Sequence, residues 1–335
     1  MVEIGVIGVN SRSCPLEVRE KLTTAFLKCF DNNSCDLFPY PYVLLSTCHR
    51  IEVYFSGKDL PSIHVLFIAL IRKIVKSSFE HYLYSFFESD VYYHLAKVTC
   101  GFDSAIIGES DIQRQVKLAY EHAKNSQKLS YTLHYLFQKS LKIGKDVRST
   151  FGSWKKEFNL EDLILGKILQ ITDDKKIPIL LIGNSYTCRN MISLLLSKNY
   201  HNLTLITRSP LTANFSSEIV VKSREDLFSW DEYPVVISAT TEMTELLEVR
   251  ESYKNKKRVV FDLSLPRTVH SMVEDQFHSL LLNIEDLSAE FIKKQESFKS
   301  ELLVCEKEIE SRAVHVYLIF QNKIYKKKAL GKSTY

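Results

Sequence analysis

Residues 177–191, "IPILLIGNSYTCRNM", decide the fold of the second half of this 335-residue chain. The apolar run ends at Gly183 and passes directly into a helical pattern. A continuous apolar run of this length is typical of a parallel strand that is buried on both faces. A strand, a glycine turn and a helix in this order predict the first unit of a nucleotide-binding sheet, because the N-terminus of the helix offers unpaired backbone N–H groups to a phosphate.

The residues that follow repeat the alternation of strand and helix. A helix leads to the strand pattern "LTLIT" (203–207), and a helical run near 223–233 leads to "VVISAT" (235–240). The strand patterns "RVVFDLSLP" (258–266) and "SLLLN" (279–283) complete the set. Such a succession predicts a doubly wound, Rossmann-type domain, which we place at residues 153–286.

The glycine turn departs from the G-x-G-x-x-G fingerprint of dinucleotide-binding domains. Ser185 and Cys188 stand where the second and third glycines belong, so a sheet turn without a ligand is an alternative. The next turn favours a cofactor, because Arg208 stands where NAD-binding domains carry a carboxylate, and a guanidinium suits the 2′-phosphate of NADPH. The candidate cofactor-binding residues are Gly183, Asn184, Ser185, Tyr186, Thr187, Cys188 and Arg208.

The first half of the chain, residues 1–152, alternates short β-rich runs with helical stretches, which predicts an α/β domain. The turn in "LLSTCHRIEVYF" (44–55) places Cys48 beside His49 and Arg50. A neighbouring cation lowers the pKa of a cysteine and favours the nucleophilic thiolate. The alternative is a cysteine that faces inward in a hairpin while Arg50 is solvated, since most lone intracellular cysteines act as small hydrophobic residues.

A second polar cluster lies in "GFDSAIIGESDIQRQVKLAY" (101–120). Gly101 and Gly108 bracket acidic and hydroxyl side chains within an otherwise apolar stretch, which favours a substrate-lining turn. The alternative is a helix-capping loop in which Ser110 is the N-cap. His94 precedes this cluster on an apolar helical face, where a lone histidine is more often a core residue than a catalytic one.

The C-terminal segment predicts a long helix. No proline or glycine occurs between Pro266 and Gly331, and apolar residues recur with helical spacing from Leu287 to Ile324. A continuous helix of this length spans roughly 60 Å. It cannot bury its apolar stripe within one small domain, so we expect residues 287–335 to form a helical dimerisation region.

The composition is that of an ordinary soluble protein, with 25% charged residues, 45% hydrophobic residues and a formal net charge of +4. No apolar run is long enough to span a bilayer, and the first residues lack the features of a signal peptide. The seven cysteines show no paired spacing, which predicts a reducing, cytoplasmic location. No C-x-x-C pair occurs, so we expect no metal site.

Together these segments resemble glutamyl-tRNA reductase, in order and over nearly the whole chain. The likeness rests on "GVNSRSCPLEVREKL" (8–22), "STCHRIEVY" (46–54), the segment 101–120, "LLIGNSYTC" (180–188) and "FDLSLPR" (261–267). The family's catalytic loop usually reads T-C-N-R, so His49 replaces an asparagine. Ser110 and Asp111 likewise replace the usual proline and glutamine.

The resemblance implies an α/β multidomain fold with an N-terminal α/β catalytic domain, a Rossmann-type NADP-binding domain and a long C-terminal helix for dimerisation. It implies that NADPH reduces the glutamate of glutamyl-tRNA to glutamate-1-semialdehyde, the first step of the C5 route to tetrapyrroles. Cys48 would form a thioester, His94 would donate or orient a proton, and Arg50 would bind the substrate carboxylate. The implied amino-acid pocket comprises Thr47, His49, Arg50, Ser104, Glu109, Ser110, Asp111 and Gln115.

The implied partners are glutamyl-tRNA, a second copy of the chain and, as a further candidate, the aminomutase that accepts the aldehyde. Two other classes of function stay open. A different NADP-dependent oxidoreductase of a small metabolite would need neither tRNA nor a covalent intermediate. A catalytically inactive tRNA-binding relative would bind tRNA without oxidising NADPH. The joint presence of Cys48, Arg50, Ser104 and Glu109 argues against both.

Overall fold

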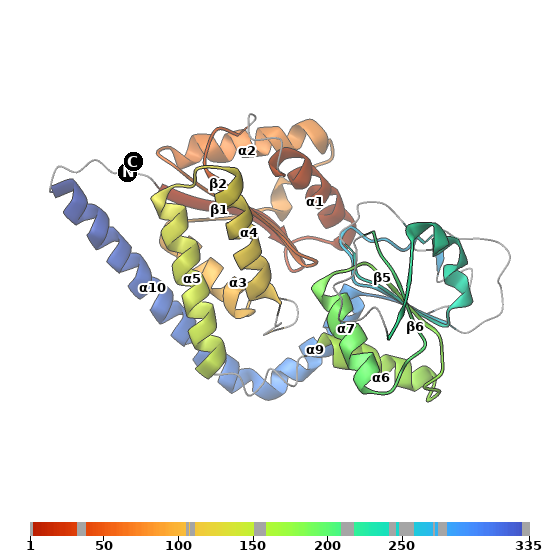
Figure 1. Ribbon diagram of the computed structural model, residues 1–335. Helices are drawn as coiled ribbons and strands as arrows, with labels where there is room; N and C mark the ends of the chain where they lie inside the picture. The colour runs from red at the N-terminus through yellow and green to blue at the C-terminus, as the bar shows by residue number, and fades with distance from the viewer. Residues whose placement is uncertain are drawn as a thin grey trace. The chain divides into compact units, whose positions relative to one another are not determined.

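The computed structural model describes residues 3–31, 38–104, 107, 111–150, 159–208, 218–240, 246–247, 258–270, 272–273 and 280–329. The chain forms two compact units (Figure 1). The first comprises Met1–Phe158 together with Ile292–Tyr335, and the second comprises Asn159–Phe291. Among the described residues, no helix is both long and apolar enough to cross a membrane.

The first unit is built on an antiparallel sheet with the strand order β2-β3-β1-β4. Its strands are β1 (Glu3–Asn10), β2 (Tyr42–Ser46), β3 (Arg50–Gly57) and β4 (Tyr84–Phe87). β2 and β3 form a hairpin in which Leu45 lies opposite Glu52. This register places Arg50, Glu52 and Tyr54 on one face of the sheet, because side chains alternate along a strand.

Helices cover both faces of this sheet (Figure 1). α1 (Leu16–Phe30) and α2 (Leu60–Ile74) pack on the face that carries Ile7 and Val53. α3 (Ser89–Cys100), α4 (Ile112–Ser126) and α5 (Tyr131–Thr150) pack on the face that carries Val6 and Tyr54. A short 3₁₀ helix, η2 (Glu80–Tyr82), precedes β4. The predicted N-terminal α/β domain is confirmed.

The second unit is a parallel sheet with the strand order β10-β9-β8-β5-β6-β7. The order reverses between β5 and β8, which is the topological switch point of a doubly wound sheet. This arrangement confirms the predicted Rossmann-type domain. Its elements are α6 (Leu160–Ile171), β5 (Ile179–Ile182), α7 (Tyr186–Ser197), β6 (Leu203–Ile206), β7 (Val220–Lys222), the 3₁₀ helix η4 (Arg224–Glu232), β8 (Val235–Ser238), β9 (Val259–Asp262), β10 (Leu280–Asn283) and the start of α9 (Ile284–Gln295).

The C-terminal region differs from the single helix that the sequence predicts. α9 is followed by a 3₁₀ turn, η5 (Glu296–Phe298), and then by α10 (Lys299–Ala329). α10 packs along α3 and α5, and its Phe320 and Ile324 belong to the core that these helices share. The premise that no surface of the same chain covers the apolar stripe is therefore wrong. Aromatic side chains explain the contact, since the Phe320 ring centroid lies 4.8 Å from that of Tyr135.

Candidate active site

Cys48 lies at the tip of the β2–β3 hairpin. The backbone N–H of Thr47 donates to the carbonyl of Arg50 at 2.9 Å. The Thr47 hydroxyl accepts hydrogen bonds from the backbone N–H groups of His49 and Arg50, both at 3.2 Å. These bonds fix the turn, as hydroxyl side chains commonly do. Of the described cysteines, Cys48 alone is not buried, so the hairpin presents its thiol.

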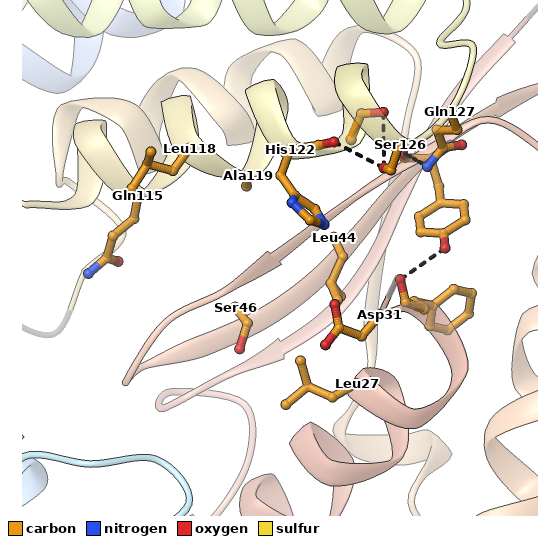
Figure 2. Close-up of a pocket in the computed structure, with 13 residues that line it drawn as sticks. Leu27, Asp31, Leu44, Ser46, Gln115, Leu118, Ala119, His122, Ser126 and Gln127 are labelled. Carbon is orange, nitrogen blue, oxygen red and sulfur yellow. Dashed lines mark hydrogen bonds between the residues drawn. The ribbon is translucent and has the colours of Figure 1, made fainter. Parts of the chain in front are cut away.

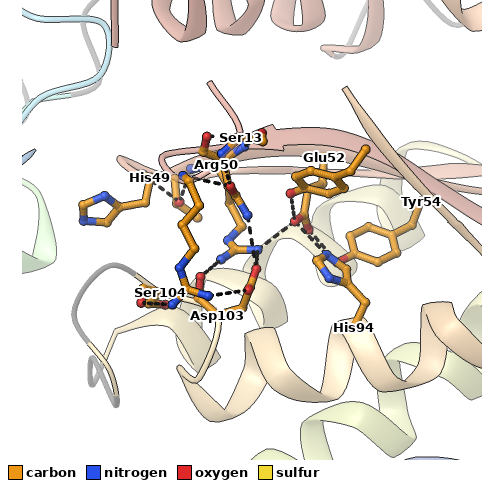
Figure 3. Close-up of polar contacts among 12 residues, drawn as sticks. Ser13, His49, Arg50, Glu52, Tyr54, His94, Asp103 and Ser104 are labelled. Carbon is orange, nitrogen blue, oxygen red and sulfur yellow. Dashed lines mark hydrogen bonds and ion pairs between the residues drawn. The ribbon is translucent and has the colours of Figure 1, made fainter. Parts of the chain in front are cut away.

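Arg50 is buried, with 1% of its surface exposed. Its Nη1 donates to a carboxylate oxygen of Glu52 at 2.8 Å and to one of Asp103 at 2.7 Å, and its Nη2 donates to the backbone oxygen of Asp103 (Figure 3). The alternative in which Cys48 faces inward and Arg50 is solvated is therefore wrong. The reason is alternation along β3, which turns Arg50 and Glu52 together towards α3.

Glu52 is the central acceptor of a buried network. His94 on α3 contacts its Oε1 through Nε2 at 2.9 Å. The hydroxyl of Tyr84 donates to Oε1 at 2.6 Å, and that of Tyr54 donates to Oε2 at 2.5 Å. Figure 3 shows His94 directed at Glu52, on the far side of Arg50 from His49. The structure thus joins His94 to the carboxylate that orients Arg50.

The electrostatics of this network favour ionised carboxylates. Burial alone would raise the pKa of Glu52, but His94 and Arg50 together lower it. The pKa of Asp103 is lowered in the same way, because Arg50 and His94 together outweigh the effect of burial. Glu52, His94 and Asp103 place three possible ligand atoms within 4.8 Å of one another. Arg50 already bonds both carboxylates from between them, so this geometry is that of an internal ion pair rather than of a metal centre.

His49 does not supply the cation that the sequence led us to expect beside Cys48. The residue is 3% exposed, and neither nitrogen of its ring has a hydrogen-bond partner within the described part of the chain. Burial, followed by the nearby charges of Arg19 and Arg50, lowers the pKa of His49 to about 3. The ring is therefore neutral near pH 7. Among the described residues, Arg19 and Arg50 are the cations whose charge acts on this ring.

The polar segment after α3 is bonded to a cation that the sequence analysis missed. Arg12, which follows β1, contacts Asp103 at 3.2 Å and is 52% exposed. Its second terminal nitrogen donates to the backbone oxygen of the buried Ser104 at 3.4 Å. The signal was the polar run "NSRS" (10–13) directly after an apolar strand. The predicted pocket residues Glu109 and Ser110 lie outside the described residues.

The other predicted pocket residues lie at the start of α4. Asp111 is buried, and its carboxylate accepts hydrogen bonds from Arg114 at 2.5 and 2.8 Å and from Gln115 at 2.8 Å. Gln115 also lines a groove of about 450 Å³ beside β2. Thus Asp111 and Gln115 bond to each other, whereas the described side-chain partners of Arg50 are Glu52 and Asp103.

The cofactor turn keeps the one glycine that its geometry requires. Gly183 has φ +103°, and a Cβ there would lie 2.4 Å from the backbone oxygen of Ala239, so no side chain fits. Ser185 caps α7 by accepting a hydrogen bond from the backbone N–H of Cys188 at 3.1 Å. Cys188 is fully buried, and burial raises its pKa to about 12. Its side chain lies on the buried face of α7.

A cavity of about 200 Å³ opens at the switch point of the parallel sheet. Four of the predicted cofactor residues line it, namely Gly183, Asn184, Ser185 and Arg208, whereas Tyr186, Thr187 and Cys188 do not. Thr207, Arg224 and Thr240 line it as well, although the sequence analysis did not select them as cofactor residues. The signal at Arg224 was a cation on the first residue of a helix, a position that disfavours positive charge. A glycine turn, a helix N-terminus and two guanidinium groups suit a phosphorylated dinucleotide.

Comparisons with known proteins match both units. Residues 7–151 match the family model of the N-terminal domain of glutamyl-tRNA(Glu) reductase, and residues 165–290 match that of shikimate/quinate 5-dehydrogenase. The glutamyl-tRNA reductase of Chlamydia trachomatis serovar A is 34% identical over 275 residues, which cover 81% of this chain and 79% of that protein. The chain belongs to the glutamyl-tRNA reductase family.

Two further matches are to glutamyl-tRNA reductases. Glutamyl-tRNA reductase of Chlamydia caviae is 32% identical over 303 residues, which cover 87% of this chain and 85% of that protein. The solved structure of glutamyl-tRNA reductase from Methanopyrus kandleri is 20% identical with a TM-score of 0.48, and the match covers 96% of this chain and 81% of that one. Membership of the glutamyl-tRNA reductase family confirms the resemblance found in the sequence, and the dehydrogenase match implies a nicotinamide cofactor.

Proposed function

We propose that this chain reduces glutamyl-tRNA with NADPH to glutamate-1-semialdehyde, the first step of the C5 route to tetrapyrroles. One observation carries the proposal. Cys48 is presented at a hairpin tip while the other described cysteines are buried, in a chain of the glutamyl-tRNA reductase family. A thiolate is a strong nucleophile, and an accessible one is what attack on an ester requires.

In the proposed reaction the Cys48 thiolate attacks the carbonyl carbon of the ester between glutamate and tRNA. The bond from that carbon to the terminal ribose oxygen breaks, the oxygen takes up a proton, and a thioester remains on the enzyme. NADPH, when bound, supplies the hydride that reduces this thioester. The carbon–sulfur bond then breaks, which frees the aldehyde and restores the thiolate. A thioester accepts hydride more readily than an ester does, and this explains the covalent route.

The side-chain carboxylate of the bound glutamate is proposed to contact Arg50, with Arg12 as a second cation. Glu52 and Asp103 take up three of the five N–H donors of Arg50, and the remaining two can bind a carboxylate. His94 acts through Glu52 as an orienting residue. Thr47, His49, Ser104, Glu109, Ser110, Asp111 and Gln115 stay the proposed lining of the amino-acid pocket.

The experiment that tests this function is NADPH oxidation by the purified chain with glutamyl-tRNA, with free glutamate as the control. We expect NADPH to be oxidised with glutamyl-tRNA and not with free glutamate. Oxidation with a small metabolite and no tRNA would instead favour another oxidoreductase. Binding of tRNA without oxidation would favour a catalytically inactive relative.

The proposed preference for NADPH depends on Arg208 and Arg224, which line one cavity with the phosphate-binding turn. A charge-assisted contact contributes on the order of 1.5 to 3 kcal/mol, which is roughly ten- to a hundredfold in affinity. We expect Arg208→Ala and Arg224→Ala each to weaken NADPH binding by this factor and to leave NADH binding nearly unchanged, as measured by fluorescence titration.

Lys198→Ala is the matched control for both arginine variants, because Lys198 is an exposed cation just beyond α7 and does not line the cavity. It should bind both cofactors as the unmodified chain does. Equal loss of NADPH and NADH in the Arg224 variant would show that this residue contacts the adenine or the ribose, and not the 2′-phosphate.

A homodimer through α10 is also proposed. One side of α10 packs on its own unit, yet Val304, Val314, Leu318 and Tyr325 remain exposed on the helix. A twofold pairing would cover this second apolar face on both copies. Light scattering should give a dimer for the full chain and a monomer for the double variant Val314→Glu, Leu318→Glu. A monomeric unmodified chain would refute the dimer.

The aminomutase partner and the cytoplasmic location stay predictions.

A further inference from the structure

The first unit contains a groove of about 450 Å³ beside β2 (Figure 2). Its floor is the outer edge of β2, which is the outermost strand of its sheet. The end of α1 forms one wall with Leu27, and α4 forms the other with Leu118 and His122. Pockets for small ligands commonly measure roughly 300 to 1,000 Å³, so the groove is large enough for one nucleoside.

The edge of β2 offers backbone donors and acceptors to this groove. In an antiparallel ladder, alternate residues turn their backbone N–H and C=O groups towards the partner strand and away from it. Thr47 donates to Arg50 and therefore faces β3. Tyr42, Leu44 and Ser46 must then turn their backbone groups outward, and no described strand pairs with this edge.

The side-chain amide of Gln127 occupies one position on the edge. Its Nε2 donates to the backbone oxygen of Tyr42 at 2.9 Å, and its Oε1 accepts from the backbone N–H of Tyr42 at 3.2 Å. The edge therefore accepts a planar group that carries a donor and an acceptor side by side. Leu44 and Ser46 offer the same pair of groups, and they lie between this amide and the hairpin turn.

The base of adenosine is a planar group of this kind, with N6–H as the donor and N1 as the acceptor. An extended peptide also carries such pairs. However, the open edge holds only the two outward residues Leu44 and Ser46, about 7 Å of strand. This is short for the addition of a strand and matches the width of one base.

The position of the groove relative to the thiol selects the nucleoside. Ser46 is the last residue of β2 and Cys48 lies two residues further, in the hairpin turn, so at most about 7 Å of chain separates them. The terminal adenosine of an aminoacyl-tRNA carries the ester on its ribose, so its base lies one sugar away from the carbon that the thiolate attacks. A base bound at Leu44 and Ser46 would therefore leave the ester at the hairpin tip.

We propose that this groove binds the base of the 3′-terminal adenosine of the substrate tRNA. Leu44 and Leu118 provide apolar contact with the base, and His122 provides a ring on which a base can stack. Gln115 lines the same groove, and its Oε1 is buried without a hydrogen-bond partner in the described part of the chain, so it can accept from a ribose hydroxyl. The inference rests on the proposed function and names the site of its nucleic-acid substrate.

The test uses the full chain and two uncharged tRNAs, one complete and one that lacks its terminal adenosine. The unmodified chain should bind the complete tRNA roughly tenfold more tightly, the factor that stacking of one base supplies. Leu118→Glu should bring this ratio close to one, because its carboxylate would lie in the groove. Leu118 is 48% exposed, so the substitution leaves the core intact. Val65→Glu, at a 67% exposed site on α2, is the matched control and should keep the tenfold ratio.

A photo-crosslink provides a second measurement that needs no variant. A complete tRNA with 8-azidoadenosine at its 3′ end should label peptides from α4 or β2. Labelling confined to other segments would overturn the proposal. Equal binding of the two tRNAs by the unmodified chain would also overturn it, as would equal binding ratios of the two tRNAs in the Leu118 and Val65 variants. In these cases an extended peptide would be the better candidate for the edge of β2. If the unmodified chain is acylated by glutamyl-tRNA in these cases, only the groove assignment fails. If it is not acylated, the proposed function fails as well.

Discussion

Cys48→Ser abolishes thioester formation and NADPH oxidation with glutamyl-tRNA, while the protein stays folded. We expect a loss of about three orders of magnitude or more, as is found when a nucleophile is removed. A serine hydroxyl needs a general base to become a nucleophile. The neighbouring His49 does not serve as this base, because its ring nitrogens are buried and have no hydrogen-bond partner among the described residues. Mass spectrometry after mixing with glutamyl-tRNA should show a glutamyl adduct on Cys48 of the unmodified chain and none on the variant.

Cys305→Ser is the control, because Cys305 lies on α10 and is buried. This variant should still form the adduct and oxidise NADPH. An adduct on any cysteine other than Cys48 would disprove the assignment of the nucleophile. Unimpaired turnover by the Cys48 variant would do the same.

Glu52→Gln should destabilise the first unit by about 3 to 5 kcal/mol, the cost of breaking a buried ion pair by removing one partner. The substitution leaves the buried guanidinium of Arg50 with less compensation and places an amide NH₂ among donors from Tyr54, Tyr84 and His94. Urea unfolding followed by circular dichroism measures the change. Glu80→Gln is the control, because its pair with Arg72 is solvent-accessible and should contribute far less to stability.

The difference between the unmodified chain and Glu52→Gln should also depend on pH. The folded pKa of Glu52 is lowered, so its carboxylate stabilises the fold fully above the ordinary pKa of a glutamate, about 4.3. That contribution is lost as the pH falls from there towards the folded pKa. The difference in unfolding free energy should therefore be larger at pH 7 than at pH 3. A difference that is constant over this range would contradict the ionised state of Glu52.

The sequence by itself determined the order and type of the elements in the second unit. A buried parallel strand is a continuous apolar run, so "ILLI" (179–182) and "VVIS" (235–238) could be recognised without a partner. The turn at Gly183 was also readable, since a glycine between a strand and a helix marks such a turn, whereas the steric limit set there by the backbone of Ala239 was not. The motif around Cys48 was readable for the same reason, because its residues are adjacent in the chain.

Only the tertiary structure decided which of these side chains are buried. Alternation along β3 implies that Arg50 and Glu52 share a face, but α3 and Asp103, distant in sequence, make that face the interior. The same long-range packing leaves His49 neutral and Cys48 accessible.

Arg12 and Arg224 escaped the sequence analysis because each reaches its site from a separate strand end. The packing of α10 on its own unit escaped it as well, since a helical stripe specifies an apolar face and not the surface that covers it. Contacts between residues that are far apart in the chain depend on how the elements pack. Local patterns of residues therefore do not predict them.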